Sequence, residues 1–102
     1  MKKLSDRKLK ELAFNFRYGI IEDQPSIQKC MMVSAPLQGF LRAIYDIQTK
    51  LEEVDFGHCN HVFLRLPDDR ILDATADQFH DMPKVYLGEM PETYKQMMKE
   101  ED

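Results

Sequence analysis

The first apolar pattern along the chain has the spacing of an amphipathic helix. Its apolar positions are Leu9, Leu12, Ala13 and Phe16. Charged residues fill the opposite face of the same segment, as expected for a helix that covers a core on one side. Ser5 is a suitable N-cap and Gly19 can close the last turn, so the pattern predicts a helix between these two residues.

A second helical stripe follows a polar loop, and its start is ambiguous. The stripe consists of Leu37, Phe40, Leu41 and Ile44. Pro36 has no backbone N–H and disfavours the α conformation in the residue before it. Two interpretations stay open: a short turn begins at Cys30 and kinks near Pro36, or the main helix begins around Ser34.

Alternating apolar and polar residues then predict strands. Residues 47–51 show this period-two pattern with Ile47, Thr49 and Leu51 on one face. Residues 62–66 repeat it, a β-rich run resumes over residues 71–75, and residues 85–87 predict a further short strand.

Residues near the end of the chain predict a terminal helix. Pro91 stands at a favourable helix start, and Tyr94, Met97 and Met98 share one face. The order of helix, helix and several strands therefore indicates an α+β domain with helices packed on an antiparallel sheet. The 102 residues match the length of a single domain, so residues 1–102 are expected to form one unit.

Composition narrows the classes of function. Hydrophobic residues make up 43% and charged residues 31% of the chain, as in ordinary soluble domains. The net charge of -4 has the wrong sign for binding a phosphate backbone, so we expect no nucleic-acid partner. No apolar run reaches the length needed to cross a bilayer, and the first residues lack a signal-peptide pattern, so the expected location is the cytoplasm, away from the membrane.

The turn between the two central strands fixes their register. Pro67-Asp68-Asp69 is typical of a type I turn followed by Asp69 in the left-handed region, a three-residue hairpin loop. Leu66 then faces Arg70, and His61 shares a sheet face with Asp73. A carboxylate at this diagonal distance can orient the imidazole. Asp77 lies on the other diagonal, and the register alone does not choose between the two acids.

A histidine oriented by a carboxylate can act as the base that activates a nucleophile, and Cys30 is the candidate nucleophile. At the start of a helix, the free N–H groups and the helix dipole would stabilise its thiolate. Gln24, on the preceding loop, is the candidate to join the Cys30 N–H in an oxyanion hole, with Gln28 as a nearer competitor. Cys59 is a lesser candidate nucleophile because no helix start activates it.

These residues resemble a known family. The order of Cys30, His61 and Asp73, together with the segments His61-Val62-Phe63-Leu64 and Ile71-Leu72-Asp73-Ala74-Thr75, is similar to the transglutaminase-like branch of the papain-like cysteine hydrolases, in particular to small bacterial members. The resemblance covers residues 24–79. It implies a small papain-like core, with Cys30 as nucleophile, His61 as general base and acid, Asp73 as orienting acid and Gln24 as oxyanion donor.

The resemblance and the residues together lead to two hypotheses. The first is a cysteine-dependent hydrolase or acyl transferase that acts on a peptide bond or a glutamine side chain of a protein or peptide, through a thioester and without a cofactor. The second is a non-catalytic binding or regulatory module on the same fold. A redox pair of Cys30 and Cys59 is a less favoured third. We expect no metal site, because His58 and His61 would not converge on one ion from a strand.

Overall fold

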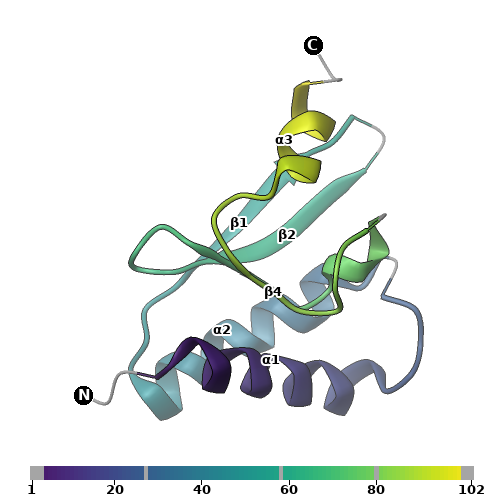
Figure 1. Cartoon of the computed structure of the whole chain (residues 1–102). Coiled ribbons are helices and arrows are strands. Elements are labelled where there is room, and N and C mark those ends of the chain that lie inside the picture. Colours follow the sequence, from purple (N-terminus) through teal and green to yellow (C-terminus); the bar gives the residue numbers. More distant parts are fainter. Residues whose placement is uncertain (1–3, 27, 58, 80, 100–102) are drawn as a thin grey trace.

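Two helices, a meandering sheet and a final short helix follow one another along the chain (Figure 1). The computed structural model describes residues 4–26, 28–57, 59–79 and 81–99. The elements within these ranges are α1 (Asp6–Ile21), α2 (Cys30–Tyr45), β1 (Lys50–Asp55), β2 (Asn60–Arg65), β3 (Ile71–Asp73), the 3-10 helix η1 (Ala76–Gln78), β4 (Tyr86–Gly88) and α3 (Glu92–Lys99). The predicted α+β class is confirmed.

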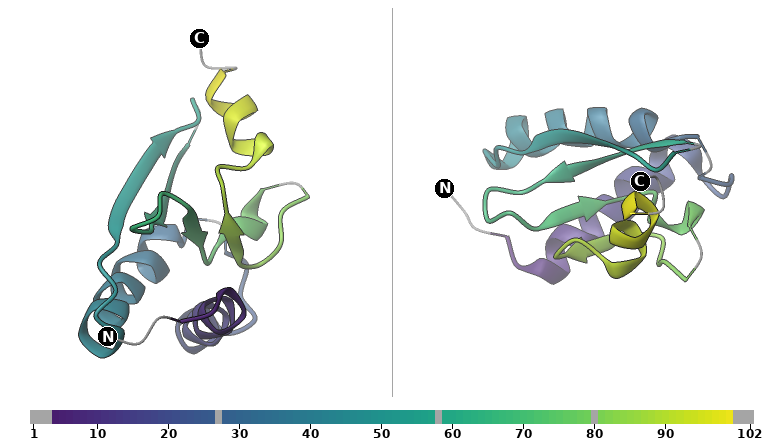
Figure 2. Two further views of the ribbon diagram at one scale, coloured as in Figure 1. Left: turned by 60° about the vertical axis from the view of Figure 1, so that its left-hand side comes forward. Right: turned by 90° about the horizontal axis from the view of Figure 1, so that it is seen from above.

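The strands form one antiparallel sheet in the order β1-β2-β3-β4. Helices α1 and α2 cover one face of the sheet, and α3 lies on the other (Figure 2). Successive side chains of each strand point to opposite faces of the sheet, because the backbone is pleated. Leu64 and Leu72 pack in the core beneath α1 and α2, whereas Phe63 and Ile71 pack with Tyr94 of α3.

Helix α1 confirms the predicted N-cap but runs further than predicted. The Ser5 side chain accepts a hydrogen bond from the Lys8 N–H at 3.1 Å. The helix continues past Gly19 and ends at Ile21, followed by Glu22 with a φ of 53°. The prediction that Gly19 closes the helix was therefore wrong, because burying Ile21 in the core extends the apolar face by half a turn.

Helix α2 begins at Cys30 and contains Pro36 in its interior, so neither of the two starts predicted for it is correct in full. Its buried stripe includes Val33, Leu37 and Leu41, on both sides of the proline. Burial of this stripe holds the helix together. Pro36 itself is exposed, so the carbonyl that loses its helical partner at residue 32 can be hydrated.

We expect Pro36→Ala to stabilise the protein by about 2 kcal/mol. Alanine restores the hydrogen bond to residue 32 and removes the ring clash, a gain of about 3 kcal/mol, less up to about 1 kcal/mol for the more flexible unfolded chain. Urea unfolding measures the change. Gly39→Ala, at an exposed position of the same helix with open space for a Cβ, should gain about 1 kcal/mol or less. A destabilised Pro36→Ala protein would contradict this account of α2.

The first strand lies later in the chain than predicted and turns its other face to the protein. It begins at Lys50, and residues 46–49 are irregular. Leu51 is exposed, while Glu52 and Val54 are half-buried. The prediction failed because β1 is an edge strand: Glu52 faces inward to bind Arg65 with two hydrogen bonds of 2.9 and 2.8 Å.

The turn between β2 and β3 confirms the predicted register. Leu66 donates its N–H to the Arg70 carbonyl at 2.8 Å, and Asp69 has a φ of 73°. The ladder between these strands pairs Leu64 with Leu72 and Arg65 with Ile71. Residues 60–63 of β2 come before these pairs and are not part of the ladder with β3, so the two strands separate near His61. None of the helices in the described ranges is long and apolar enough to span a membrane.

Candidate active site

His61 and Asp73 form a buried pair at the point where β2 and β3 separate. The Nε2 atom of His61 lies 2.5 Å from Oδ2 of Asp73. Both side chains have an exposed fraction of 0%. The hairpin turn produces this contact, because its register brings the first part of β2 and the end of β3 to the same face of the sheet.

Cys30 is the first residue of α2 and reaches the same histidine. Burial alone raises the pKa of its thiol, but the hydrogen bond with His61 and a backbone hydrogen bond from Val62 lower it below the ordinary value. A backbone bond from Met31, in the first turn of α2, acts in the same direction. Asp73 contacts Nε2 of the same ring.

The neighbours of His61 favour its charged form. Burial alone lowers the pKa of the imidazole, but hydrogen bonds and charge interactions with Asp73 and Cys30 raise it to about 9. The raised pKa of His61 and the lowered pKa of Cys30 belong to one coupled pair, and both shifts favour transfer of a proton from sulfur to nitrogen. They therefore favour a thiolate and an imidazolium over a neutral thiol and a neutral imidazole.

Tyr94 completes the surroundings of Asp73 and was not predicted as a site residue. Its hydroxyl donates to Oδ2 of Asp73, the oxygen that also binds His61, and lies 3.5 Å from His61 Nε2. Burial, and then the charge of Asp73, raise the pKa of Tyr94, so it remains a donor. The backbone N–H of Thr75 donates to the other oxygen, Oδ1, at 3.0 Å. The only hint in the sequence was a tyrosine on an apolar helix face, whose hydroxyl needs a buried partner.

Gln78 is the second residue that the sequence analysis missed. Its side-chain Nε2 lies 3.2 Å from Nδ1 of His61. It also donates to the Thr75 carbonyl at 3.0 Å. A polar residue shortly after the strand that carries Asp73 was a usable signal, because the chain has to turn there beside the pair.

Aromatic rings enclose the imidazole. The ring centroids of four side chains lie within 6.1 Å of the His61 centroid, and they belong to Phe79, Tyr94, Phe63 and Phe56. Cys30 keeps an exposed fraction of 9%. Cys30 is therefore slightly more accessible than His61 and Asp73, which have an exposed fraction of 0%.

Asp77, the alternative orienting acid, has other partners. Its two oxygens bind Arg17 at 2.7 and 2.8 Å, and Ser26 donates to one of them at 2.6 Å. Burial raises the pKa of Asp77, but the hydrogen bonds from Arg17 and Ser26 lower it below the ordinary value. Asp77 thus ties η1 to α1 and to the loop before α2, and Asp73 is the acid that binds His61.

The predicted oxyanion residues lie on the loop between α1 and α2. Gln24 is exposed, and its backbone N–H bonds the Ile21 carbonyl at 2.9 Å. Gln28 is also exposed and has a φ of 64°. The structure thus brings Cys30, His61 and Asp73 together, whereas the hydrogen bonds of the described residues do not link Gln24 to that group. Its role stays a prediction.

The second cysteine, Cys59, and the histidines considered as metal ligands all lie in or next to the start of β2 along the chain. Cys59 is half-buried, and both cysteines are free thiols. Within the described ranges, no cluster of histidine, cysteine or acidic residues is arranged to hold a metal ion. His58, named in the metal argument, lies outside the described residues.

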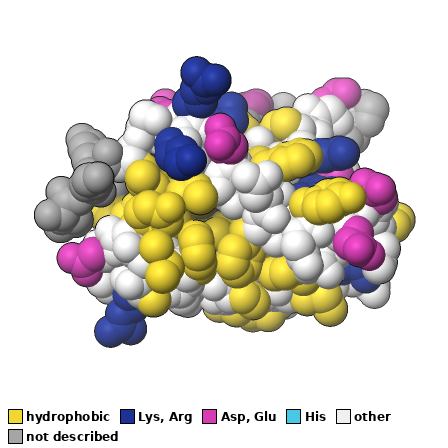
Figure 3. Space-filling view, turned by 90° about the horizontal axis from the view of Figure 1, so that it is seen from below, with side chains coloured by type: hydrophobic (Ala, Val, Ile, Leu, Met, Phe, Trp, Pro, Cys, Tyr) yellow, Lys and Arg dark blue, Asp and Glu magenta, His cyan; other side chains and the backbone are white. Residues whose placement is uncertain are grey.

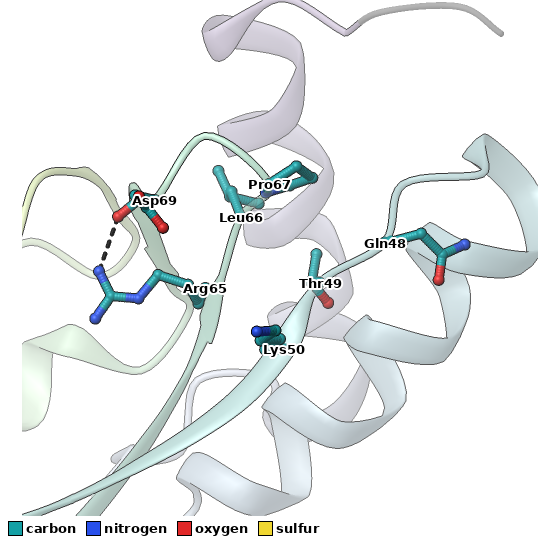
Figure 4. Close-up of a pocket in the computed structure, with 7 residues that line it drawn as sticks. All are labelled: Gln48, Thr49, Lys50, Arg65, Leu66, Pro67 and Asp69. Atoms are coloured by element: carbon teal, nitrogen blue, oxygen red, sulfur yellow. Dashed lines mark hydrogen bonds between the residues drawn. The ribbon is translucent and has the colours of Figure 1, made fainter.

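A shallow pocket lies at the other end of the β1–β2 pair (Figure 4). It is lined by Gln48, Thr49, Lys50, Arg65, Leu66, Pro67 and Asp69. Arg65 is held there by Glu52 and by the Asp69 carbonyl. Arg65 lies four positions after His61 in β2, roughly 13 Å along an extended strand. The pocket is therefore not part of the cysteine and histidine site.

An apolar surface lies on the helical side of the molecule. Figure 3 shows hydrophobic side chains gathered over the side that α1 and α2 form. The exposed large apolar residues of these helices are Phe14, Tyr18, Met31, Met32 and Ile44. Two of them, Met31 and Met32, directly follow Cys30 in the first turn of α2.

Comparison with protein-family models, with curated proteins and with solved structures finds no match to this chain.

Proposed function

We propose that this protein is a cysteine-dependent hydrolase or acyl transferase that acts on a carboxamide, either a peptide bond or a glutamine side chain of a protein or peptide. The observation that carries the proposal is the continuous series of contacts from Cys30 at a helix start, through His61, to Asp73. A thiol, an imidazole and an orienting carboxylate in this order are the parts of a nucleophilic triad.

The proposed reaction has two stages. Cys30 transfers its proton to His61, and the thiolate attacks the amide carbon, so that an S–C bond forms and the carbonyl electrons move to oxygen. The Cys30 N–H and Gln24 are the proposed donors to that oxyanion. The C–N bond then breaks, and the leaving amine takes the proton from His61. Water or an amine, deprotonated by His61, attacks the thioester and releases the thiolate, and no cofactor enters either stage.

The family and location remain part of the same proposal. We assign the chain to the transglutaminase-like, papain-like cysteine hydrolases and to the cytoplasm. The α+β class, the cysteine at a helix start and the histidine and aspartate on successive strands support the family. Met31 and Met32, which follow Cys30 in the chain and are exposed, are suited to contact an apolar part of the substrate.

Burial of the site favours a second candidate function. His61 and Asp73 have an exposed fraction of 0%, and Tyr94 also binds Asp73. A fully satisfied buried network can hold a fold together without any turnover. A non-catalytic binding or regulatory module is the function that this observation supports.

Alkylation of Cys30 distinguishes the two functions. In a Cys59→Ala protein, we expect iodoacetamide to label Cys30 well below pH 8, because the neighbouring imidazole stabilises the thiolate. His61→Ala should return the pKa of Cys30 toward about 8.5 and lower the labelling rate near pH 6.5 by at least about tenfold. Mass spectrometry of the labelled protein measures the rate.

The controls separate a reactive thiol from an accessible one. Cys30→Ser in the same background should show no labelling. Incubation with glutamine-containing peptides, followed by ammonia and peptide analysis, measures turnover, which Cys30→Ser should abolish. If Cys30 is labelled only after unfolding in urea, and no peptide is changed, the enzymatic proposal fails and the non-catalytic function stands.

A further inference from the structure

Gln78 is held beside the reactive pair, Cys30 and His61, by contacts of the residues directly before and after it. Its neighbour Asp77 is bound by Arg17 of α1 and by Ser26 of the loop before α2. The next residue, Phe79, packs its ring edge-on against His61 at a centroid distance of 4.7 Å. The Gln78 side chain therefore approaches His61 from an anchored backbone and is not a free surface amide.

The hydrogen bonds of Gln78 determine which way its amide points. The Thr75 carbonyl oxygen lies 3.0 Å from Nε2, and a carbonyl can only accept. If the amide were rotated, its own oxygen would face that carbonyl at the same short distance. The nitrogen is therefore the atom that lies 3.2 Å from Nδ1 of His61. An amide nitrogen can only donate, so this contact requires a lone pair on Nδ1.

The need for a lone pair on Nδ1 conflicts with the preference of the other groups around the His61 ring. Asp73 of β3 faces Nε2, Cys30 of α2 faces the ring, and the Tyr94 hydroxyl of α3 lies near Nε2. The carboxylate and a thiolate both favour an imidazolium, which carries a proton on Nδ1. With that proton in place, the N–H group of the Gln78 amide would face the N–H group at Nδ1, and neither could accept a hydrogen bond.

We propose that Gln78 is a positioning residue of this site, whose amide donates to Nδ1 of His61 and opposes transfer of the Cys30 proton to the imidazole. The inference rests on the proposed function only in that it concerns the same reactive pair. In the free protein, Gln78 shifts the pair toward neutral thiol and neutral imidazole. Displacement of the amide from Nδ1 removes this opposition, so the charged, nucleophilic pair becomes more favourable, with the proton moving from sulfur to Nδ1 and no other bond changed.

The test is a pH titration of the Cys30 thiolate by its ultraviolet absorbance in a Cys59→Ala protein, which needs no reagent or substrate. Gln78→Leu and Gln78→Met remove the donor at similar volume. We expect each to lower the midpoint of thiolate formation by about one pH unit, the size of one neutral hydrogen bond. Gln48→Leu, the same change at an exposed position outside the site, should leave the midpoint unchanged.

A midpoint that stays at the parent value, or moves to higher pH, in the two Gln78 variants would overturn the inference. If both variants fail to fold, nitrogen NMR of the parent decides: a coupling across the hydrogen bond between Gln78 Nε2 and His61 Nδ1 is expected, and its absence with His61 neutral would overturn the inference. Failure of the proposed function looks different, because a shifted midpoint without any turnover of peptides leaves the role of Gln78 intact.

Discussion

Asp73→Asn is expected to lower the turnover of a carboxamide substrate by about 10⁴-fold, the scale known for replacing the orienting acid of a nucleophilic triad. The physical reason is the tautomer of His61. The asparagine can turn its amide nitrogen toward Nε2, which must then accept, and the ring proton moves to Nδ1. In that form, Nδ1 cannot take the proton of Cys30. Turnover of glutamine-containing peptides and Cys30 alkylation at neutral pH measure the loss.

The same substitution has a pH signature in stability. His61 has a pKa raised to about 9, so its pairing with Asp73 stabilises the fold fully below the ordinary histidine pKa of about 6.5. This contribution is lost as the pH rises through about 9. Asp73→Asn should therefore cost about 2 kcal/mol near pH 6, and the difference from the parent should shrink above about pH 9. Urea unfolding across this range measures it.

Asp77→Asn is the matched control for the orienting acid. It should weaken the bonds to Arg17 and Ser26, and so cost stability, but because Asp73 still binds His61, Cys30 should keep its alkylation at neutral pH. The reverse result, with Asp77→Asn abolishing reactivity and Asp73→Asn leaving it intact, would show that the wrong acid has been assigned.

Arg17→Met is the second substitution with a large expected effect, a loss of about 3–5 kcal/mol in the free energy of unfolding. Arg17 is buried and binds Asp77 through two hydrogen bonds, while its NH1 also donates to the carbonyls of Ala74 and Lys84 at 3.2 and 3.0 Å. Methionine fills much of the volume but removes the Arg17 donors from two carbonyl oxygens and from the Asp77 carboxylate, which keeps the Ser26 hydroxyl.

The cost of Arg17→Met should depend on pH with the opposite sign to that of Asp73→Asn. Asp77 has a lowered pKa in the folded protein, so its pairing stabilises the fold above the ordinary aspartate pKa of about 3.9 and is lost as the pH falls further. The difference between parent and variant should shrink in acid. Arg42→Met, at an exposed position of α2, should change stability by no more than about 0.5 kcal/mol, and an equal loss in both variants would contradict the role of Arg17.

Features that depend on neighbours in the sequence were predictable. The N-cap at Ser5 follows from a local side-chain bond, and the hairpin register follows from Pro67 and from Asp69 in the left-handed region. The shared sheet face of His61 and Asp73 could therefore be derived from the turn, whereas the choice of Asp73 over Asp77 could not. The bounds of β1 could not, because an edge strand with Glu52 turned toward Arg65 lacks the apolar alternation on which the prediction relied.

The amino-acid pattern alone predicted the α+β class, the hairpin that places His61 and Asp73 on one face of the sheet, and Cys30 as the candidate nucleophile. Only the tertiary structure decided that α2 continues through Pro36, that Asp77 belongs to Arg17, and that Tyr94 and Gln78 flank the reactive pair. The physical reason is distance along the chain. Local patterns record which face of an element is buried, whereas the partner of a buried polar group comes from segments that meet only when the helices and the sheet pack together.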